Sequence, residues 1–152
     1  MKTVVHGTCV ALGGDCALLR GAPGAGKSDL ALRFLFLPSE ALPARPALVA
    51  DDQVILRRGD GSILASCPRA LSGKIEVRGI GIVKAPATTP EARLTLIADL
   101  DSASEIPRFP EGDRWETVLD VPVRHILLNP FELSAPLKLA LALQNFPQEP
   151  PD

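Results

Sequence analysis

The sequence has few cysteines, few aromatic residues and almost no net charge, and each shortage excludes a class of protein. Three cysteines, Cys9, Cys16 and Cys67, are too few and too irregularly spaced for a disulfide framework or a zinc site. Lys and Arg number 16 against 18 Asp and Glu, so the net charge of −2 gives no overall attraction for nucleic acid or an anionic membrane. The longest apolar runs fall short of the ~20 residues that cross a bilayer. We therefore expect a cytoplasmic protein with structural thiols and with neither a nucleic-acid nor a membrane partner.

Tyrosine is absent, aromatic residues make up only 4%, and 15 prolines break the chain, which argues against a long helical bundle. A length of 152 residues with 46% hydrophobic composition suits one domain with one core. We assign residues 1–146 to this single domain. Residues 147–152, polar and rich in proline, are expected to form a flexible tail.

Hydrophobic periodicity and turn residues predict a chain rich in strands with two helices. Strands are expected at residues 2–6, 8–12, 16–20, 47–50, 53–56, 62–65, 74–77, 80–83, 93–98, 117–121 and 123–127. The first three are expected to pair as an antiparallel meander, and 53–56 to pair with 62–65 as a hairpin. Helices are expected at 29–37 and at 134–145, the second with Ser134 as N-cap and Pro136 in its first turn. Residues 101–113 are expected to form a surface loop.

A glycine-rich segment between an apolar strand and a helix matches the Walker A phosphate loop, Gly-x-x-x-x-Gly-Lys-Ser. Its residues are Gly21, Ala22, Pro23, Gly24, Ala25, Gly26, Lys27 and Ser28. In such a loop successive backbone N–H groups point at phosphate oxygens, and the helix N-terminus adds partial positive charge. Lys27 then reaches the β and γ phosphates, and Ser28 offers its hydroxyl to Mg²⁺. The sequence therefore predicts a site for a nucleoside triphosphate with Mg²⁺.

Phosphoryl transfer also needs a carboxylate that manages the metal or the nucleophile, and two strand ends supply one. Asp51 and Asp52 follow the strand at 47–50, and Asp99 follows the strand at 93–98. Either end is a candidate. We favour the adjacent pair because side chains alternate along an extended chain, so that one carboxylate can face the metal while the other faces the substrate.

Two further groups are candidates for the same site. His6 ends a strand, and a histidine beside an acid can tune a proton transfer, although a histidine in a strand is also an ordinary packed or surface residue. Glu76 and Arg78 are two residues apart and therefore lie on one face of a strand, with glycines behind them. Together they suit a metal-phosphate site, and the alternative is a structural ion pair.

These motifs occur in an order that resembles the catalytic domain of the HPr kinase/phosphorylase family. The matching residues are His6-Gly7, the loop 21–28, the triplet 50–52 and the stretch 75–82, which is similar to the family's Glu-Ile-Arg-Gly-(Leu/Val)-Gly-Ile hallmark. The resemblance covers about residues 4–130. It implies an α/β P-loop kinase fold of the phosphoenolpyruvate-carboxykinase-like type, a mixed sheet with flanking helices. It also implies ATP-dependent phosphorylation of a serine on HPr, the small phosphocarrier of the sugar phosphotransferase system.

The resemblance also implies a role for each matching residue. Lys27 would hold the transferred phosphate, and Ser28 and Glu76 would bind Mg²⁺. Asp52 would take the proton of the substrate serine, with Asp51 supporting it. His6 matches the family's active-site histidine. Arg78 joins this catalytic set beside Glu76, and Arg114, in Asp113-Arg114-Trp115, is similar to a catalytic arginine of an Asp-Arg-Leu stretch in the family.

The chain departs from the family pattern at three places. Met1 lies almost at the catalytic histidine, so the chain resembles the short forms found in α-proteobacteria, whose partner is an HPr-like protein linked to regulation. Asp29 stands where Glu usually follows the phosphate-loop serine. The family's Pro-Val-Arg-Pro-Gly-Arg run is reduced to Pro122-Val123-Arg124. Because that run is tied to the reverse phosphorolysis, we expect at most a residual phosphorylase activity.

Two rival functions stay open beside the protein-serine kinase. One is a kinase for a small molecule, with the loop 101–113 as a lid. The other is a regulatory module that senses nucleotide without turnover and docks on a sensor kinase. A homo-oligomer is expected because the family forms hexamers.

Overall fold

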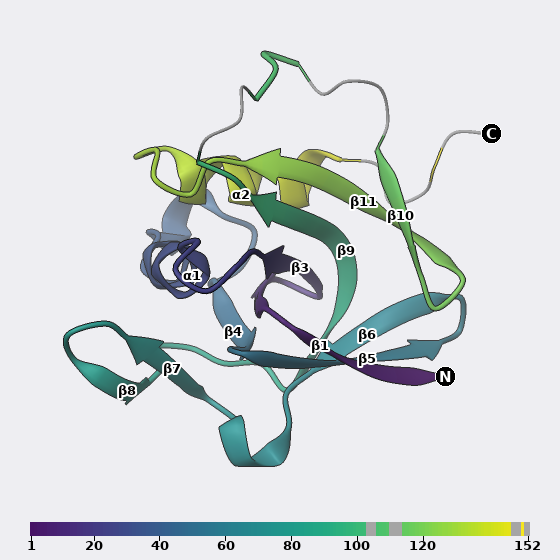
Figure 1. Ribbon diagram of the computed structural model, residues 1–152, viewed down its shortest axis with the longest axis horizontal. Helices are drawn as coiled ribbons and strands as arrows, with labels where there is room; N and C mark the ends of the chain where they lie inside the picture. Colours follow the sequence, from purple (N-terminus) through teal and green to yellow (C-terminus); the bar gives the residue numbers. More distant parts are fainter. Residues whose placement is uncertain (103–105, 110–113, 147–149, 151–152) are drawn as a thin grey trace.

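The computed structural model describes residues 1–102, 106–109, 114–146 and 150, and its centre is a nine-stranded mixed sheet (Figure 1). The strand order is β1-β5-β6-β9-β3-β2-β4, with β11 paired to β9 and β10 paired to β11. The strands are β1 Lys2–His6, β2 Thr8–Leu12, β3 Asp15–Arg20, β4 Ala47–Ala50, β5 Gln53–Gly59, β6 Ser62–Ser66, β9 Glu91–Leu100, β10 Trp115–Val118 and β11 Val121–Leu128. The predicted α/β class and mixed sheet are confirmed.

The middle of the sheet is parallel. Strand β9 pairs in parallel with β3 on one side and with β11 on the other. The three strands therefore end at the same edge, where Arg20 of β3 lies opposite Asp99 of β9. The glycine-rich loop 21–26 leaves the sheet at this edge.

Two helices cover one face of the sheet, α1 Lys27–Leu35 and α2 Ala135–Asn145. Leu30 and Phe34 of α1 pack with Leu139 of α2 and with sheet residues such as Val10 and Leu96, and all five are buried. This contiguous core holds α1, and with it the loop that precedes α1, against the sheet.

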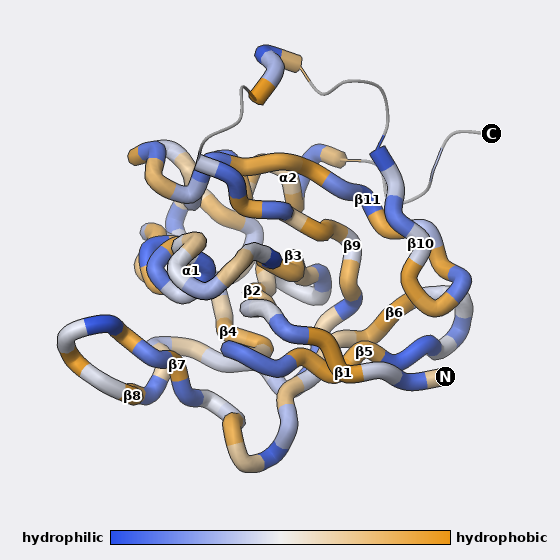
Figure 2. The backbone as a smooth tube through the Cα atoms, viewed as in Figure 1, coloured by the Kyte–Doolittle hydropathy of each residue, from blue (hydrophilic) through white to orange (hydrophobic). Residues whose placement is uncertain are grey.

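The opposite face of the sheet packs mostly on other strands. Alternation along β2 sends Val10 to the helix side and Cys9 to the other, where it meets residues of β5 and β6 such as Leu56 and Ile63. The sheet therefore curls, with β1, β5 and β6 folded beneath β3 and β9 (Figure 1). Figure 2 shows hydrophobic residues recurring along β9 and β11, interrupted by hydrophilic ones.

A hairpin of β7 Lys74–Val77 and β8 Gly81–Lys84 forms a separate two-stranded sheet (Figure 1). It is anchored by Ile75, which is fully buried in the helix-side core, whereas Ile80 and Ile82 near its tip are exposed. Residues 76–78 are thereby brought beside α1.

The structure differs in detail from the expected elements at three points. The first strand is not part of a meander: β1 pairs with β5, and only β2 and β3 form the expected hairpin. Ser134 is the N-cap residue of α2 and a proline occupies the first turn, as predicted, but the Ser134 side chain makes no capping hydrogen bond. Helix α1 begins at Lys27, two residues earlier than expected.

Parts of the expected surface loop and of the expected tail, residues 103–105, 110–113, 147–149 and 151–152, lie outside the described residues. The three cysteines are free, and burial raises the pKa of Cys16 and Cys67, which fits structural thiols. No helix in the described ranges is both long and apolar enough to span a membrane.

Candidate functional site

The glycine-rich loop curls because two of its glycines adopt positive φ angles. Gly24 has φ 83° and Gly26 has φ 101°, conformations that side chains rarely tolerate. A Cβ on Gly26 would also lie 3.3 Å from Pro130 and 3.4 Å from Phe131. Gly26 directly precedes α1 and makes no side-chain cap, so the start of the helix faces the loop with its N–H groups. This is the arrangement that binds phosphate at a helix N-terminus.

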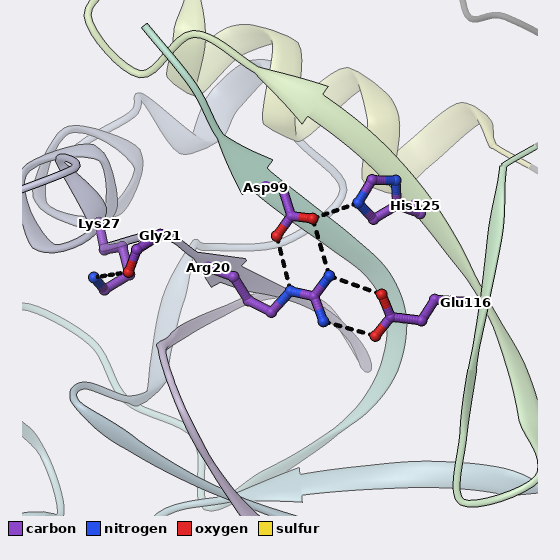
Figure 3. Close-up of polar contacts among 6 residues, drawn as sticks. All are labelled: Arg20, Gly21, Lys27, Asp99, Glu116 and His125. Atoms are coloured by element: carbon purple, nitrogen blue, oxygen red, sulfur yellow. Dashed lines mark hydrogen bonds and ion pairs between the residues drawn. The ribbon is translucent and has the colours of Figure 1, made fainter. Parts of the chain in front are cut away.

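Lys27 is folded back onto the loop. Its Nζ donates to the carbonyl oxygen of Gly21 at 2.6 Å (Figure 3). It also donates to the carbonyl oxygen of Ala22, at 3.1 Å. Two backbone carbonyls of the loop therefore hold the Lys27 ammonium. Both acceptors are neutral, so these contacts leave its positive charge in place.

A cavity of about 440 Å³ opens beside the loop. It is lined by Gly24, Gly26, Lys27, Ser28, Asp29, Leu32, Glu76, Val77, Arg78 and Phe131. The loop supplies one wall and the hairpin strand β7 with its turn supplies the other, so Glu76 and Arg78 face the same space as Lys27. The structure thus brings together two motifs that lie about 50 residues apart.

The carboxylate of Asp51 accepts three hydrogen bonds next to this cavity. Its Oδ1 accepts hydrogen bonds from the hydroxyls of Ser28, at 3.0 Å, and Thr8, at 2.8 Å. Its Oδ2 accepts from the backbone N–H of Glu76 at 3.1 Å. The carboxylate is buried, and these bonds tie α1, β2 and β7 together at one point. Burial is tolerated because both oxygens have donors.

The side chain of Asp52 contacts His6 and solvent instead of Ser28. Its φ of 77° is in the left-handed region, and the N–H of Gln53 donates to the carbonyl of Asp51 across it at 3.1 Å. Its carboxylate lies 3.2 Å from Nδ1 of His6, and both side chains are more than half exposed. The backbone around the pair is fixed because Gly7 N–H donates to the Asp52 carbonyl at 3.0 Å. Adjacent aspartates therefore present one carboxylate to the loop serine and one to solvent.

The oxygens around the cavity suit Mg²⁺ bound to phosphate. The Ser28 hydroxyl and the Asp51 carboxylate are in contact, and Glu76 lines the cavity. Within the described part of the chain, no group of three or more His, Cys, Asp or Glu side chains is placed to hold a metal ion. Mg²⁺ is commonly held by one or two protein oxygens together with substrate phosphates, so this donor set fits that ion.

A second cluster of charged residues lies next to the start of the loop, around Arg20 (Figure 3). The Arg20 guanidinium donates to both oxygens of Asp99, at 2.8 and 2.9 Å, and to both oxygens of Glu116, at 2.6 and 2.7 Å. Nε2 of His125 lies 2.6 Å from Oδ2 of Asp99. Hydrogen bonds to Asp99 and then Glu116 raise the pKa of Arg20 above its ordinary range. Burial raises the pKa of Asp99, but hydrogen bonds from Arg20 and His125 outweigh it, so that this pKa lies below its ordinary value.

The structure places some of the predicted residues on the cavity wall and others beside it. Gly24, Gly26, Lys27, Ser28, Glu76 and Arg78 line the cavity, and Asp51 is bonded to Ser28. The exposed His6–Asp52 pair adjoins Asp51 in the sequence and does not line the cavity. Arg114 does not line this cavity and instead lines a separate one of about 290 Å³ that also contains His125.

Sequence reasoning missed several polar residues. Thr8, which donates to Asp51, carries no motif. One feature of the sequence could have identified Arg20: it is a charged residue at the end of an apolar strand, directly before the loop. Asp99, the alternative acid, has both oxygens bound by Arg20 and His125 and does not line the cavity.

A glycine-rich loop between a central strand and a buried helix, with a carboxylate bonded to the first serine of that helix, is the arrangement of a phosphate-binding-loop protein. Comparison of the sequence with models of known protein families identifies the family within this class. A model of the HPr Serine kinase C-terminal domain matches residues 1–130, and the chain belongs to this family.

Relatives of this family align along most of the chain. The HPr kinase/phosphorylase of Bordetella pertussis is 35% identical over 136 residues, which cover 83% of this chain and 42% of that protein. The HPr kinase/phosphorylase of Clostridium acetobutylicum is 31% identical over 136 residues, covering 84% and 42%. The chain thus spans less than half the length of these relatives.

A solved structure shows the same fold. The Hpr(Ser) kinase/phosphatase from Coxiella burnetii superposes with a TM-score of 0.76 at 24% identity, and the match covers 94% of this chain and 95% of that chain.

Proposed function

We propose that this chain is a Mg-ATP-dependent kinase that phosphorylates a serine of HPr or of an HPr-like phosphocarrier protein. The observation that carries the proposal is the divergence of Asp51 and Asp52. One carboxylate is bonded to Ser28 beneath the loop, and its neighbour is exposed beside His6, where a protein substrate has access. Family membership and the names of the relatives support the same chemistry.

The triphosphate would lie along the loop with its outer phosphate toward the cavity. Loop N–H groups and the start of α1 would bind its oxygens, and Lys27 would exchange the carbonyls of Gly21 and Ala22 for the β and γ phosphates. Arg78 lines the opposite wall and adds positive charge there. Ser28 and Glu76, with Asp51 behind them, would hold Mg²⁺, which when bound neutralises charge that develops on the phosphate oxygens.

Asp52 would accept the proton of the substrate serine hydroxyl. The serine oxygen forms a bond to the γ phosphorus, the bond from that phosphorus to the β–γ bridging oxygen breaks, and ADP leaves. His6 would orient the Asp52 carboxylate through the 3.2 Å contact. Because little covalent chemistry falls to the protein, positioning and charge carry the reaction.

Labelled ATP, Mg²⁺ and a purified HPr-like protein test this function, with the modified residue mapped. We expect label on a serine of the carrier. Lys27→Ala is expected to reduce the rate at least ~100-fold, the scale of a lost preorganised donor. Lys84→Ala, an exposed lysine at the end of β8, is the matched control and should leave the rate unchanged. Label on a histidine, or near-native turnover by Lys27→Ala, contradicts the proposal.

Four finer points belong to this proposal. The role predicted for Arg114 stays a prediction, as do a homo-oligomer, a sensor-kinase partner and a residual phosphorylase activity. A small-molecule kinase would consume ATP with a metabolite and ignore the carrier. A nucleotide sensor would bind ATP and be indifferent to Asp52→Asn, so the same assay separates all three functions.

A further inference from the structure

Arg20 occupies a special position, the last residue of β3 and one peptide bond before the glycine-rich loop (Figure 3). Its backbone is set in the parallel ladder opposite Asp99 of β9. Its side chain reaches the carboxylates of two other strands, Asp99 on β9 and Glu116 on β10, with four hydrogen bonds between 2.6 and 2.9 Å. A guanidinium that binds two carboxylates in this way is fixed in direction as well as in charge.

His125 completes the arrangement from a fourth strand. Its Nε2 lies 2.6 Å from the same Asp99 oxygen that accepts from Arg20. The ends of β3 and β9 are therefore joined to β10 and β11 by side chains as well as by the backbone ladder. The cluster is partly buried: the Arg20 side chain is 31% exposed and that of Asp99 is 36% exposed.

The cluster does not line the loop cavity, so it cannot act as a phosphate ligand in this arrangement. Any influence of the cluster on a bound phosphate must therefore act through the position of the loop. Gly21, the next residue after Arg20, accepts the 2.6 Å hydrogen bond from the Lys27 ammonium. A Cβ on Gly21 would lie 2.7 Å from Cβ of Ala25, so the two ends of the loop are packed together. A shift at the end of β3 would therefore move both the Gly21 carbonyl and the loop that Lys27 contacts.

We propose that Arg20 and Asp99 are positioning residues for the phosphate-binding loop, with Glu116 and His125 as their supports. They hold the end of β3 so that the loop amides and Lys27 are arranged for phosphate before the nucleotide arrives. Preorganisation of this kind acts on affinity, because a loose loop must be ordered when the ligand binds. The proposal rests on the proposed function in one respect, that the ligand of the loop is a nucleotide.

The experiment compares nucleotide affinity and turnover in the full chain. A fluorescent ATP analogue is titrated with Mg²⁺ into the unsubstituted protein and into Asp99→Asn, and KM for ATP and kcat are measured with the carrier protein. We expect Kd and KM to rise about tenfold in Asp99→Asn, the scale of one charge-assisted hydrogen bond. At saturating ATP we expect kcat to change by less than about threefold, since the reacting groups are untouched.

Glu91→Gln is the matched control. Glu91 lies on the same strand as Asp99 but at the opposite end, and it forms a comparable ion pair with Arg57 at 3.1 Å. Loss of this pair should leave Kd and KM unchanged. Should Asp99→Asn fail to fold, Glu116→Gln becomes the decisive variant, with an expected rise in Kd of about threefold because Arg20 keeps Asp99.

Each outcome has a separate meaning. An unsubstituted chain that does not bind the analogue overturns the proposed function and this proposal with it. If the unsubstituted chain binds and the folded variants bind equally well, only the positioning role is overturned. A fall in kcat with unchanged Kd overturns it too, because the cluster would then act on the chemical step.

Discussion

At the scale of single residues, two neighbouring aspartates with identical side chains have opposite surroundings. Asp51 is buried under three donors, whereas Asp52 is turned by a positive φ toward solvent and His6. A buried carboxylate with satisfied oxygens stabilises the fold, and an exposed one is free to meet a substrate. Substitution should therefore separate stability from activity.

We expect Asp51→Asn to lower the free energy of unfolding by about 1–3 kcal/mol, because the new amide group would face a donor where an acceptor is required. Asp52→Asn should change stability by less than ~0.5 kcal/mol, as for exposed sites, while abolishing phosphoryl transfer. Urea unfolding and the transfer assay measure the two effects. Equal stability losses in both variants would contradict this assignment of roles.

At the scale of elements, the end of β1 shows how close packing places a side chain. A Cβ on Gly7 would lie 2.8 Å from the carbonyl oxygen of Leu19 and 2.9 Å from Cδ1 of Leu18, so only glycine fits there. Gly7 also donates to the carbonyl of Asp52. The glycine therefore fixes the register of the chain that carries His6.

Gly7→Ala should displace the end of β1 and separate His6 from Asp52. We expect kcat for transfer to fall, because the 3.2 Å contact that orients the Asp52 carboxylate is lost. Gly14→Ala, in a turn where a Cβ meets nothing within 4 Å, is the control. An unchanged kcat in Gly7→Ala would show that the His6 position is unimportant.

The charged cluster of Arg20, Asp99, Glu116 and His125 predicts a pH dependence of stability. The pKa of Asp99 is lower in the folded protein than its ordinary value of 3.8, so ionised Asp99 contributes stability at neutral pH. That contribution is lost as pH falls through the folded pKa. The difference in unfolding free energy between the unsubstituted chain and Asp99→Asn should therefore shrink between about pH 5 and pH 3. A difference that stays constant over this range would exclude the Asp99 carboxylate as its source.

The elements show where sequence reasoning succeeds and where it stops. Strand positions and the loop followed by α1 were predictable because alternation and glycine spacing are local signals. The pairing of β1 with β5 was not, since it joins segments about 50 residues apart without a local turn. The Arg20 cluster was hidden for the same reason: its hydrogen bonds span 79 and 96 residues.

At the scale of the whole molecule, the mixed sheet and the separate hairpin β7–β8 bring the site residues together. The parallel strands β3, β9 and β11 end together at one edge of the sheet, and the loop begins at the end of β3 (Figure 1). Strand β7 and the turn after it line the other side of the cavity. Helices α1 and α2 share one core and hold the loop against this edge. The site therefore depends on long-range packing, although its signature in the sequence is short.

Residues 21–28 are expected to wrap a triphosphate whose outer phosphorus lies within reach of Asp52. A crystal structure of the chain with Mg²⁺ and a non-hydrolysable ATP analogue tests it most directly. We predict the γ phosphate between the Lys27 ammonium and the Asp52 carboxylate, with Ser28 at the metal. A nucleotide bound outside the loop, or a γ phosphate on the side of the cavity away from Asp52, would contradict the claim.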